Sequence, residues 1–195
     1  MVPALLSILL GYLLGSVPFG LILNRLSGGP DLRSIGSGSI GATNVLRTGN
    51  KGIALLTVLL DGLKGAVAGW FALSLFGAPM QFVAAAAALF GHCFPIWLRF
   101  RGGKGVATFF GSLFGLVWPL GLVAAATWLL VAFTTRYSSA AGLSAAAFTT
   151  AVSLLFYPLP VKLMLLAMTA LIVFRHKDNI LRLKSGTESK IGSKS

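Results

Sequence analysis

The chain has 195 residues, of which 56% are hydrophobic and 10% are charged, and its mean hydropathy is +0.88. This composition excludes an ordinary soluble domain and is typical of a membrane protein that crosses the bilayer several times. The 16 basic and 4 acidic residues give a net charge of +12, but cations gather on the cytoplasmic side of membrane proteins and beside anionic lipids, so the excess does not indicate a nucleic-acid partner.

Long apolar stretches separated by breakers and cations predict seven membrane-spanning helices in an all-α polytopic protein. The stretch from 105 to 174 is divided at Arg136 and Tyr137, because a cation followed by an aromatic residue is typical of a membrane surface. The alternative is five spans, with two long helices and re-entrant segments in this stretch. The seven predicted spans are 2–24, 53–75, 80–98, 105–117, 120–135, 139–156 and 159–174. Glycines at GxxxG spacing predict close helix packing; they are Gly11 and Gly15, Gly65 and Gly69, and Gly111 and Gly115.

The distribution of cations predicts the orientation in the membrane. With seven spans, the loops 25–51 and 99–104, Arg136 and the tail from 175 face one side, and they hold 14 of the 16 cations. The positive-inside rule places this side in the cytoplasm and the N-terminus outside. We therefore expect a single integral-membrane domain over 1–195 that ends in a basic cytoplasmic tail at 175–195.

The first polar segment on the predicted cytoplasmic side, 34–47, contains a GxGxxG pattern from Gly36 to Gly41. It is not a dinucleotide-binding fingerprint, because a membrane span precedes it and no βαβ alternation follows. Glycines and serines before a short helix, predicted at 41–48, instead present backbone N–H groups to an anion, and Arg47 adds a guanidinium suited to phosphate. An ordinary Gly/Ser connection is the alternative.

The second polar segment ends in Gly102-Gly103-Lys104-Gly105. It is not a Walker A loop, because Leu98 stands where the first glycine is required and Gly105 where a serine or threonine is required. Glycines allow close approach of a ligand to the backbone and lysine adds a point charge, so Lys104 is a candidate anion ligand. The alternative is a basic loop that anchors to lipid headgroups.

The third polar segment, 175–183, follows the last span. If that span continues as a helix, Arg175, Asn179 and Arg182 share a face, and His176 lies one turn from Asn179. A plain basic stop-transfer sequence is the alternative, although it needs neither the histidine nor the asparagine.

Groups suited to acid–base or nucleophilic catalysis are scarce, since the chain has two histidines, four acids and one cysteine. Neither His92 nor His176 is followed five positions later by an acid, which excludes the His-x4-Asp mechanism of soluble glycerolipid acyltransferases. Asp61 and Lys64 are expected to pair within the second span, and Cys93 is expected to be a buried, inert thiol rather than a nucleophile. Many anion-binding groups without a convincing base suit a reaction of an already activated substrate.

The three polar segments resemble, in order, the cytoplasmic motifs of the bacterial acyl-phosphate:glycerol-3-phosphate acyltransferases, the PlsY family. The matching stretches are 36–44, 102–108 and 175–183, followed by Gly186-Thr187-Glu188, and the resemblance covers essentially the whole chain. It implies a seven-helix enzyme of the bacterial cytoplasmic (inner) membrane. Such an enzyme transfers a fatty acyl group from long-chain acyl phosphate to the 1-hydroxyl of sn-glycerol 3-phosphate, giving lysophosphatidic acid and phosphate. The resemblance implies no metal, no cofactor and no thioester donor.

The resemblance also implies site residues, carried over position by position. The catalytic set is Lys104, His176 and Asn179. The substrate-binding set is Ser37, Gly38, Thr43, Asn44, Arg47, Gly103, Arg136 and Ser139. As a mechanism, we expect the loop 37–44 to cradle acyl phosphate, while Arg47 and the catalytic set fix glycerol 3-phosphate and stabilise the oxyanion. Gly142 stands where some family members have a serine.

Two other functions use similar residues. A transporter or channel for an anionic metabolite would want its cations along a path at mid-membrane rather than on one face. A lipid phosphatase or phosphotransferase would show a histidine or aspartate nucleophile flanked by arginines.

Overall fold

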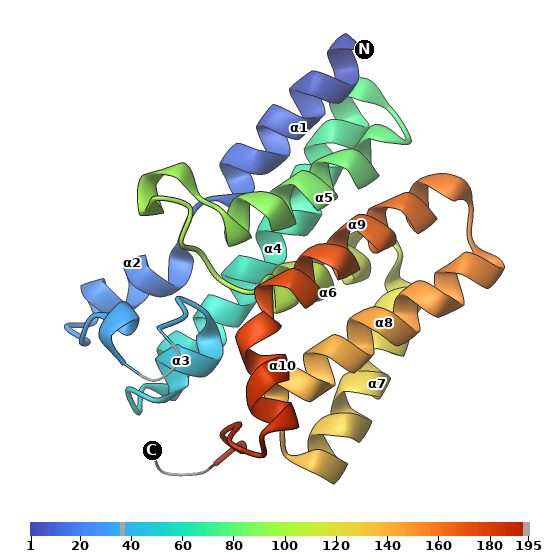
Figure 1. Ribbon diagram of the computed structural model, residues 1–195. Helices are drawn as coiled ribbons and strands as arrows, with labels where there is room; N and C mark the ends of the chain where they lie inside the picture. The colour runs from blue at the N-terminus through green and yellow to red at the C-terminus, as the bar shows by residue number, and fades with distance from the viewer. Residues whose placement is uncertain (36–37, 193–195) are drawn as a thin grey trace.

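The computed structural model describes residues 1–35 and 38–192, and the regular structure within these residues is helical (Figure 1). The α-helices are α1 (Val2–Gly15), α2 (Phe19–Leu26), α3 (Ala42–Leu46), α4 (Lys51–Phe76), α5 (Met80–Cys93), α6 (Val106–Leu116), α7 (Trp118–Thr135), α8 (Ser138–Phe156), α9 (Leu159–Arg175) and α10 (Lys177–Lys184), with 3-10 turns at Leu32–Ser34 and Ile96–Leu98.

Five helical segments are long and apolar enough to cross a membrane: Val2–Leu26, Lys51–Phe76, Met80–Leu98, Trp118–Thr135 and Ser138–Phe156. Helices α9 and α10 make a sixth only if taken together, with a bend of 59° between them. The apolar helix α6 has 11 residues, which gives it a length of ~16 Å, about half the thickness of the hydrocarbon core. The structure therefore agrees with an all-α polytopic membrane protein that has five or six full-length candidate spans.

Local signals explain where several helices begin and end. The Asn50 side chain caps α4 by accepting a hydrogen bond from the Ile53 amide at 3.0 Å. Helices α7 and α9 carry Pro119 and Pro160 in their first turn, where the missing N–H costs nothing. Between α7 and α8, Arg136 has a left-handed backbone with φ of 62°, so a sharp turn stands where the sequence predicts a membrane surface.

The first predicted span matches the candidate span Val2–Leu26, but its helix and the helix at the end of the last span are both interrupted. The first span, predicted over 2–24, is broken at Ser16–Pro18: Pro18 has no N–H to extend the ladder, and the Lys64 ammonium donates to the freed Val17 carbonyl at 3.0 Å. The last span does not continue as one straight helix, because the chain bends at His176 between α9 and α10. Arg175 and Arg182 therefore do not share one helix face, and they contact different partners.

Small residues allow the helices to approach closely, as the GxxxG spacing predicts. A Cβ at Gly11 or Gly15 would collide with the backbone of Ala84 or Ala88, so α1 lies directly against α5. A Cβ at Gly111 would likewise collide with the backbone of Gly62, which brings α6 against α4. The core between α5, α6, α8 and α9 is then filled by larger side chains, of which Phe109, Leu113, Leu165 and Ile172 are at most 1% exposed.

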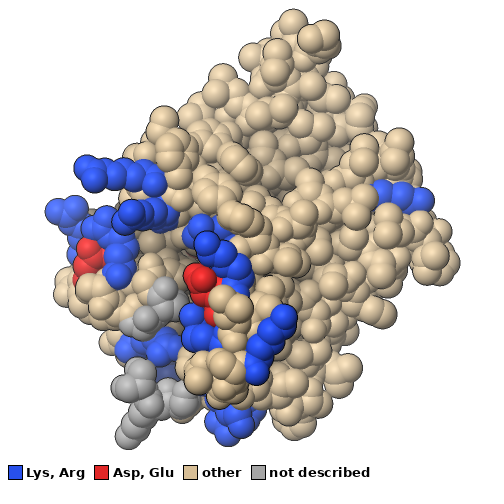
Figure 2. Space-filling view, in the orientation of Figure 1, with Lys and Arg blue, Asp and Glu red and all other residues tan. Residues whose placement is uncertain are grey.

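The outer surface separates into an apolar body and a basic end. Large apolar side chains such as Phe133, Leu155 and Phe156 are more than 70% exposed on the helices, as expected where lipid replaces water. Lysine and arginine gather at the end of the molecule that carries α2, α3 and α10 (Figure 2), whereas α1 begins at the opposite end (Figure 1).

Candidate active site at the basic end

The first predicted motif forms a loop that Asn44 organises. The Asn44 side chain is 2% exposed, and its Nδ2 donates to the carbonyls of Leu32 at 2.7 Å and Ser39 at 2.8 Å. Gly38 has φ of +65°, a conformation that favours glycine. Helix α3 follows and leaves Thr43 and Arg47 exposed beside it. Asn44 therefore shapes the loop, and Ser37, which is predicted to bind substrate, lies outside the described residues.

The second motif is a clamped loop. From one side the backbone of α5 accepts hydrogen bonds: Gly102 N–H donates to the Cys93 carbonyl at 3.1 Å and Gly103 N–H to the His92 carbonyl at 3.0 Å. From the other side Arg175 donates to the carbonyls of Gly102 and Gly103 at 2.9 and 3.0 Å. The backbone that carries Lys104 is thus fixed from both sides, and Arg175 acts as a structural cation.

Lys104 itself is half-buried at this clamp and has no hydrogen bond or ion pair with another residue that the structure describes. Burial lowers the pKa of Lys104; the nearby Glu188 carboxylate opposes this effect, and Arg182 and Arg175 add to it. A half-buried ammonium that keeps its donors unused is suited to bind an anion.

The third motif places its histidine and asparagine inward. His176 is 2% exposed, and its Nδ1 lies 2.8 Å from the Ile172 carbonyl. Because a carbonyl only accepts, Nδ1 carries the proton and Nε2 is left as an acceptor. Burial lowers the pKa of His176 to about 4, helped by the charge of Lys104 and opposed by the hydrogen bond to Ile172. The imidazole is therefore neutral at physiological pH and only weakly basic.

Glu188 is the residue to which the sequence alone assigns no role. Its Oε1 accepts from Ser139 Oγ and Asn179 Nδ2, each at 2.6 Å, and its Oε2 accepts from Arg182 Nε at 2.7 Å. Burial disfavours the carboxylate, but these hydrogen bonds and Arg182 outweigh it and lower the pKa of Glu188. The sequence could have indicated a role for Glu188, because it is one of only four acids in the chain and ends the third motif.

The segment after α10 joins the remaining predicted residues to this corner. Arg47 donates to Ser189 Oγ at 2.8 Å, and Arg136 exchanges backbone and side-chain hydrogen bonds with Ile191 at 2.7 and 3.0 Å. Ser139 and Asn179 thus meet at Glu188, whose charge also acts on Lys104 and His176. Arg47 and Arg136 reach this corner through the tail. Gly142, one turn along α8 from Ser139, packs on Val106, where a Cβ would lie 3.2 Å from a methyl group.

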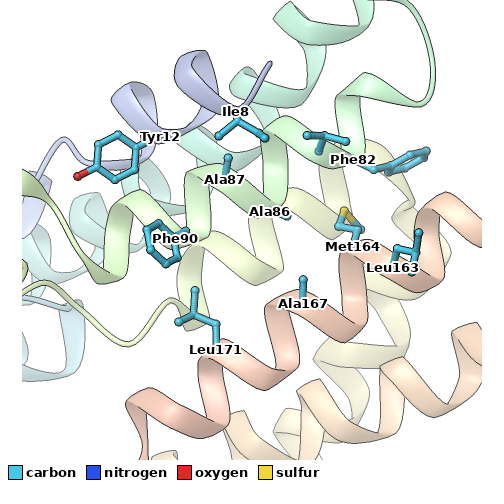
Figure 3. Close-up of a pocket in the computed structure, with 11 residues that line it drawn as sticks. Ile8, Tyr12, Phe82, Ala86, Ala87, Phe90, Leu163, Met164, Ala167 and Leu171 are labelled. Carbon is cyan, nitrogen blue, oxygen red and sulfur yellow. The ribbon is translucent and has the colours of Figure 1, made fainter. Parts of the chain in front are cut away.

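An apolar groove runs along α1, α5 and α9 (Figure 3). It has a volume of about 510 Å³ and is lined by side chains that include Ile8, Tyr12, Ala86, Phe90, Ala167 and Leu171. Phe90 contacts Phe94 with a ring-centroid distance of 5.1 Å, and the Arg175 guanidinium lies 5.2 Å from the Phe94 ring. Phe94 therefore links the lining residue Phe90 to Arg175, the cation that holds the Lys104 loop. In the part of the chain that the structure describes, no three His, Cys, Asp or Glu side chains are grouped as metal ligands.

A sequence model of the glycerol-3-phosphate acyltransferases matches residues 5–186. The chain belongs to the glycerol-3-phosphate acyltransferase family. Curated proteins called glycerol-3-phosphate acyltransferase match over almost their full length: one from Rhodopseudomonas palustris (strain BisB5) is 55% identical over 96% of both chains, and one from Nitrobacter winogradskyi is 54% identical over 97% of both.

Two crystal structures of PlsY (YgiH), an integral membrane glycerol 3-phosphate acyltransferase, have the same fold. The glycerol 3-phosphate form is 37% identical, with a TM-score of 0.90 over 97% of this chain and 96% of that one. The lysophosphatidic acid form is 36% identical, with a TM-score of 0.89 over 97% and 95% of the two chains. The family, the enzyme class and the acylation of glycerol 3-phosphate predicted from the three motifs are confirmed, and they replace the transporter and phosphotransferase alternatives.

Proposed function

We propose that this enzyme uses long-chain acyl phosphate as donor and acylates the 1-hydroxyl of sn-glycerol 3-phosphate at the cytoplasmic face of a bacterial inner membrane. The proposal rests on two features that occur together at the basic end. The Lys104 ammonium bonds to no other described residue, and His176 is only weakly basic. Acyl phosphate brings its own leaving group, so a site with strong anion binding and no strong base is sufficient for it.

In the proposed reaction the 1-hydroxyl oxygen attacks the carbonyl carbon of acyl phosphate. The new ester bond forms, the bond from that carbon to the bridging phosphate oxygen breaks, and the departing phosphate takes the hydroxyl proton. Lys104 stabilises the negative charge that develops, and His176 Nε2 accepts a hydrogen bond from the hydroxyl and orients it. If His176 only orients, a His176→Asn variant keeps measurable activity; complete loss with intact substrate binding would make it the base.

The other polar residues divide between the two phosphates. The loop from Ser37 to Asn44, with Gly38 and Thr43, presents backbone and hydroxyl donors to acyl phosphate, and Gly103 lets that phosphate approach the clamped backbone. Arg47 and Asn179 hold glycerol 3-phosphate, with Ser139 and Arg136 completing its site next to the tail. Arg47 is exposed, and Asn179 and Ser139 are brought together by their hydrogen bonds to the Glu188 carboxylate.

The apolar groove supports a long-chain donor. A chain seated between α1 and α9 would run along Phe90 and Leu171 and meet the polar site beside Phe94 and Arg175. Lipids of the surrounding bilayer are the other partners of this surface.

The distribution of charge supports the membrane orientation. The cations gather at the end of the molecule opposite the start of α1 (Figures 1 and 2), and the positive-inside rule then puts the site in the cytoplasm and the N-terminus outside. This arrangement needs an odd number of crossings, which α6 provides as a short seventh helix within a single domain over 1–195, ending in the basic tail at 175–195.

The donor is tested with purified enzyme, glycerol 3-phosphate and either palmitoyl phosphate or palmitoyl-CoA. We expect lysophosphatidic acid and equimolar phosphate from palmitoyl phosphate alone. Product from the thioester alone would overturn the proposal. Added chelator serves as a control and should leave the rate unchanged.

A further inference from the structure

A second group of ionisable side chains lies inside the bundle and takes no part in the proposed mechanism. Asp61, Lys64 and His92 are 2, 5 and 4% exposed. Lys64 Nζ lies 2.8 Å from Asp61 Oδ1, and His92 Nδ1 lies 3.7 Å from the same oxygen. Ionisable groups inside a membrane protein are costly, so a buried set of three requires a function.

This buried cluster joins four parts of the chain. The Asp61–Lys64 pair lies on α4, and Lys64 also donates to the Val17 carbonyl at the break between α1 and α2. The Asp61 carbonyl accepts from Thr108 Oγ1 on α6 at 2.8 Å. His92, in the last turn of α5, is the member of the cluster that lies next to the site.

His92 contacts the clamped loop with both its backbone and its ring. Its carbonyl accepts from Gly103 N–H at 3.0 Å. The imidazole fills the space of the side chain that Gly103 lacks, since a Cβ at that position would collide with Nε2 and lie 2.8 Å from Cε1. The opposite side of Gly103 is held by Arg175, whose Nε donates to the Gly103 carbonyl at 3.0 Å. The residue before Lys104 is therefore held between an imidazole and a guanidinium.

We propose that His92 is a positioning residue for Lys104. Nδ1 faces Asp61 Oδ1 at 3.7 Å and forms no hydrogen bond with a described residue, so the charge of the Asp61–Lys64 pair orients the ring without a direct bond. The ring packs against Gly103, and Gly103 sets where the Lys104 ammonium lies in the site. This inference rests on the proposed function, because it requires Lys104 to act on the reacting substrates. A displacement of about 1 Å at a catalytic group can reduce turnover about 100-fold, so a ring that does not touch the reacting atoms can still affect the rate.

The test is a double-mutant cycle of His92→Gln and Lys104→Ala, measured as kcat and KM with palmitoyl phosphate and glycerol 3-phosphate. We expect His92→Gln to lower kcat about 10- to 100-fold with little change in KM. In the Lys104→Ala background the same substitution should lower kcat less than about 3-fold, because its effect passes through Lys104. Equal losses in both backgrounds would overturn the inference.

The cycle separates this inference from the proposed function. If Lys104→Ala alone keeps near-normal turnover, the proposed function fails; if it is slow but His92→Gln acts additively, only the positioning role fails. Ser112→Ala is the matched control, because Ser112 is equally buried and bonds only within α6. It should leave kcat within about 2-fold.

A second pair of variants tests the same contact if His92→Gln does not fold. Gly103→Ala pushes on the imidazole from the loop side, because the three atoms nearest to a Cβ there all belong to the imidazole and the Gly103 backbone is not in the left-handed region. We expect Gly103→Ala to lower kcat at least about 10-fold and His92→Ala combined with Gly103→Ala to recover part of that loss. A single Gly103→Ala variant with unchanged kcat would overturn the inference.

Discussion

The two charged clusters of this enzyme contain similar residues but differ in what is left unpaired. In the buried cluster the Lys64 ammonium is fully engaged by Asp61 and the Val17 carbonyl. At the basic end the carboxylate of Glu188 is the engaged group, while the Lys104 ammonium has no bond to another described residue. Comparable chemistry therefore stabilises the bundle in one place and leaves a charge available for substrate in the other.

The largest effect on stability should come from breaking the buried pair. Asp61→Ala leaves the buried Lys64 ammonium without its carboxylate and with only the Val17 carbonyl, which costs about 3–5 kcal/mol of unfolding free energy. The combined variant Asp61→Leu and Lys64→Met should recover most of that stability without recovering full activity, because nothing then fixes His92. Thermal unfolding in detergent measures this, with the exposed Asp178→Ala as control. A stable Asp61→Ala variant would contradict the structural role of the pair.

The basic end should lose stability in mild acid. Burial lowers the pKa of His176 from 6.5 to about 4, so the unfolded chain takes up a proton first as the pH falls below 6.5. The folded state should thus lose up to ~3 kcal/mol between pH 6.5 and 4 through this group, and nothing above pH 6.5. The melting temperature followed over this range in wild type and His176→Asn checks the prediction. Identical pH profiles of the two proteins would contradict it.

The negative charge of Glu188 organises the basic end, so removing it should slow the reaction. Glu188→Gln keeps the size of the side chain but leaves Arg182 and Lys104 without their nearby carboxylate. We expect kcat/KM to fall about 10-fold, or ~1.4 kcal/mol, because Asn179 and Ser139 lose a charged acceptor. The exposed Asp178→Asn is the matched control. An unchanged kcat/KM would show that this carboxylate does not organise the site.

No side chain that lines the apolar groove belongs to either charged cluster, so changing the groove should alter chain-length preference rather than stability or catalysis. Ala86→Trp and Ala167→Trp fill the groove in its middle. We expect a several-fold lower kcat/KM for palmitoyl phosphate and little change for an octanoyl donor, consistent with roughly 0.8 kcal/mol for each buried methylene. Trp at Leu129, an exposed position on α7, is the control. Equal effects on both chain lengths would place the acyl chain elsewhere.

Local patterns of the sequence predicted much of the fold. Hydropathy located the apolar helices, and the i, i+3 spacing predicted the Asp61–Lys64 pair. The glycine spacing predicted close helix packing, but not that α1 contacts α5 or that α4 contacts α6. The break at Ser16–Pro18 has a local signal in Pro18, which the predicted span overlooked, whereas its stabilising contact from Lys64 comes from 47 positions away.

The roles of the candidate site residues stay predictions, and the sequence did not indicate how these residues are connected. The roles of Arg175 and Glu188 depend on contacts across 72 and 49 positions, to Gly103 and Ser139, and no local spacing encodes them. For Asn44, too, the contacts could not be predicted from the sequence. The motif resemblance predicts a substrate ligand, whereas Asn44 Nδ2 donates to carbonyls of its own loop. Its contact with substrate, like those of Thr43 and Gly38, stays a prediction.

The measurement that tests the central claim most directly is the turnover of Lys104→Ala with palmitoyl phosphate and glycerol 3-phosphate, beside the exposed control Lys184→Ala. We expect kcat/KM of Lys104→Ala to fall at least about 100-fold, which corresponds to ~3 kcal/mol of lost transition-state stabilisation, with Lys184→Ala unchanged. Near-normal turnover of a folded Lys104→Ala enzyme would contradict the account.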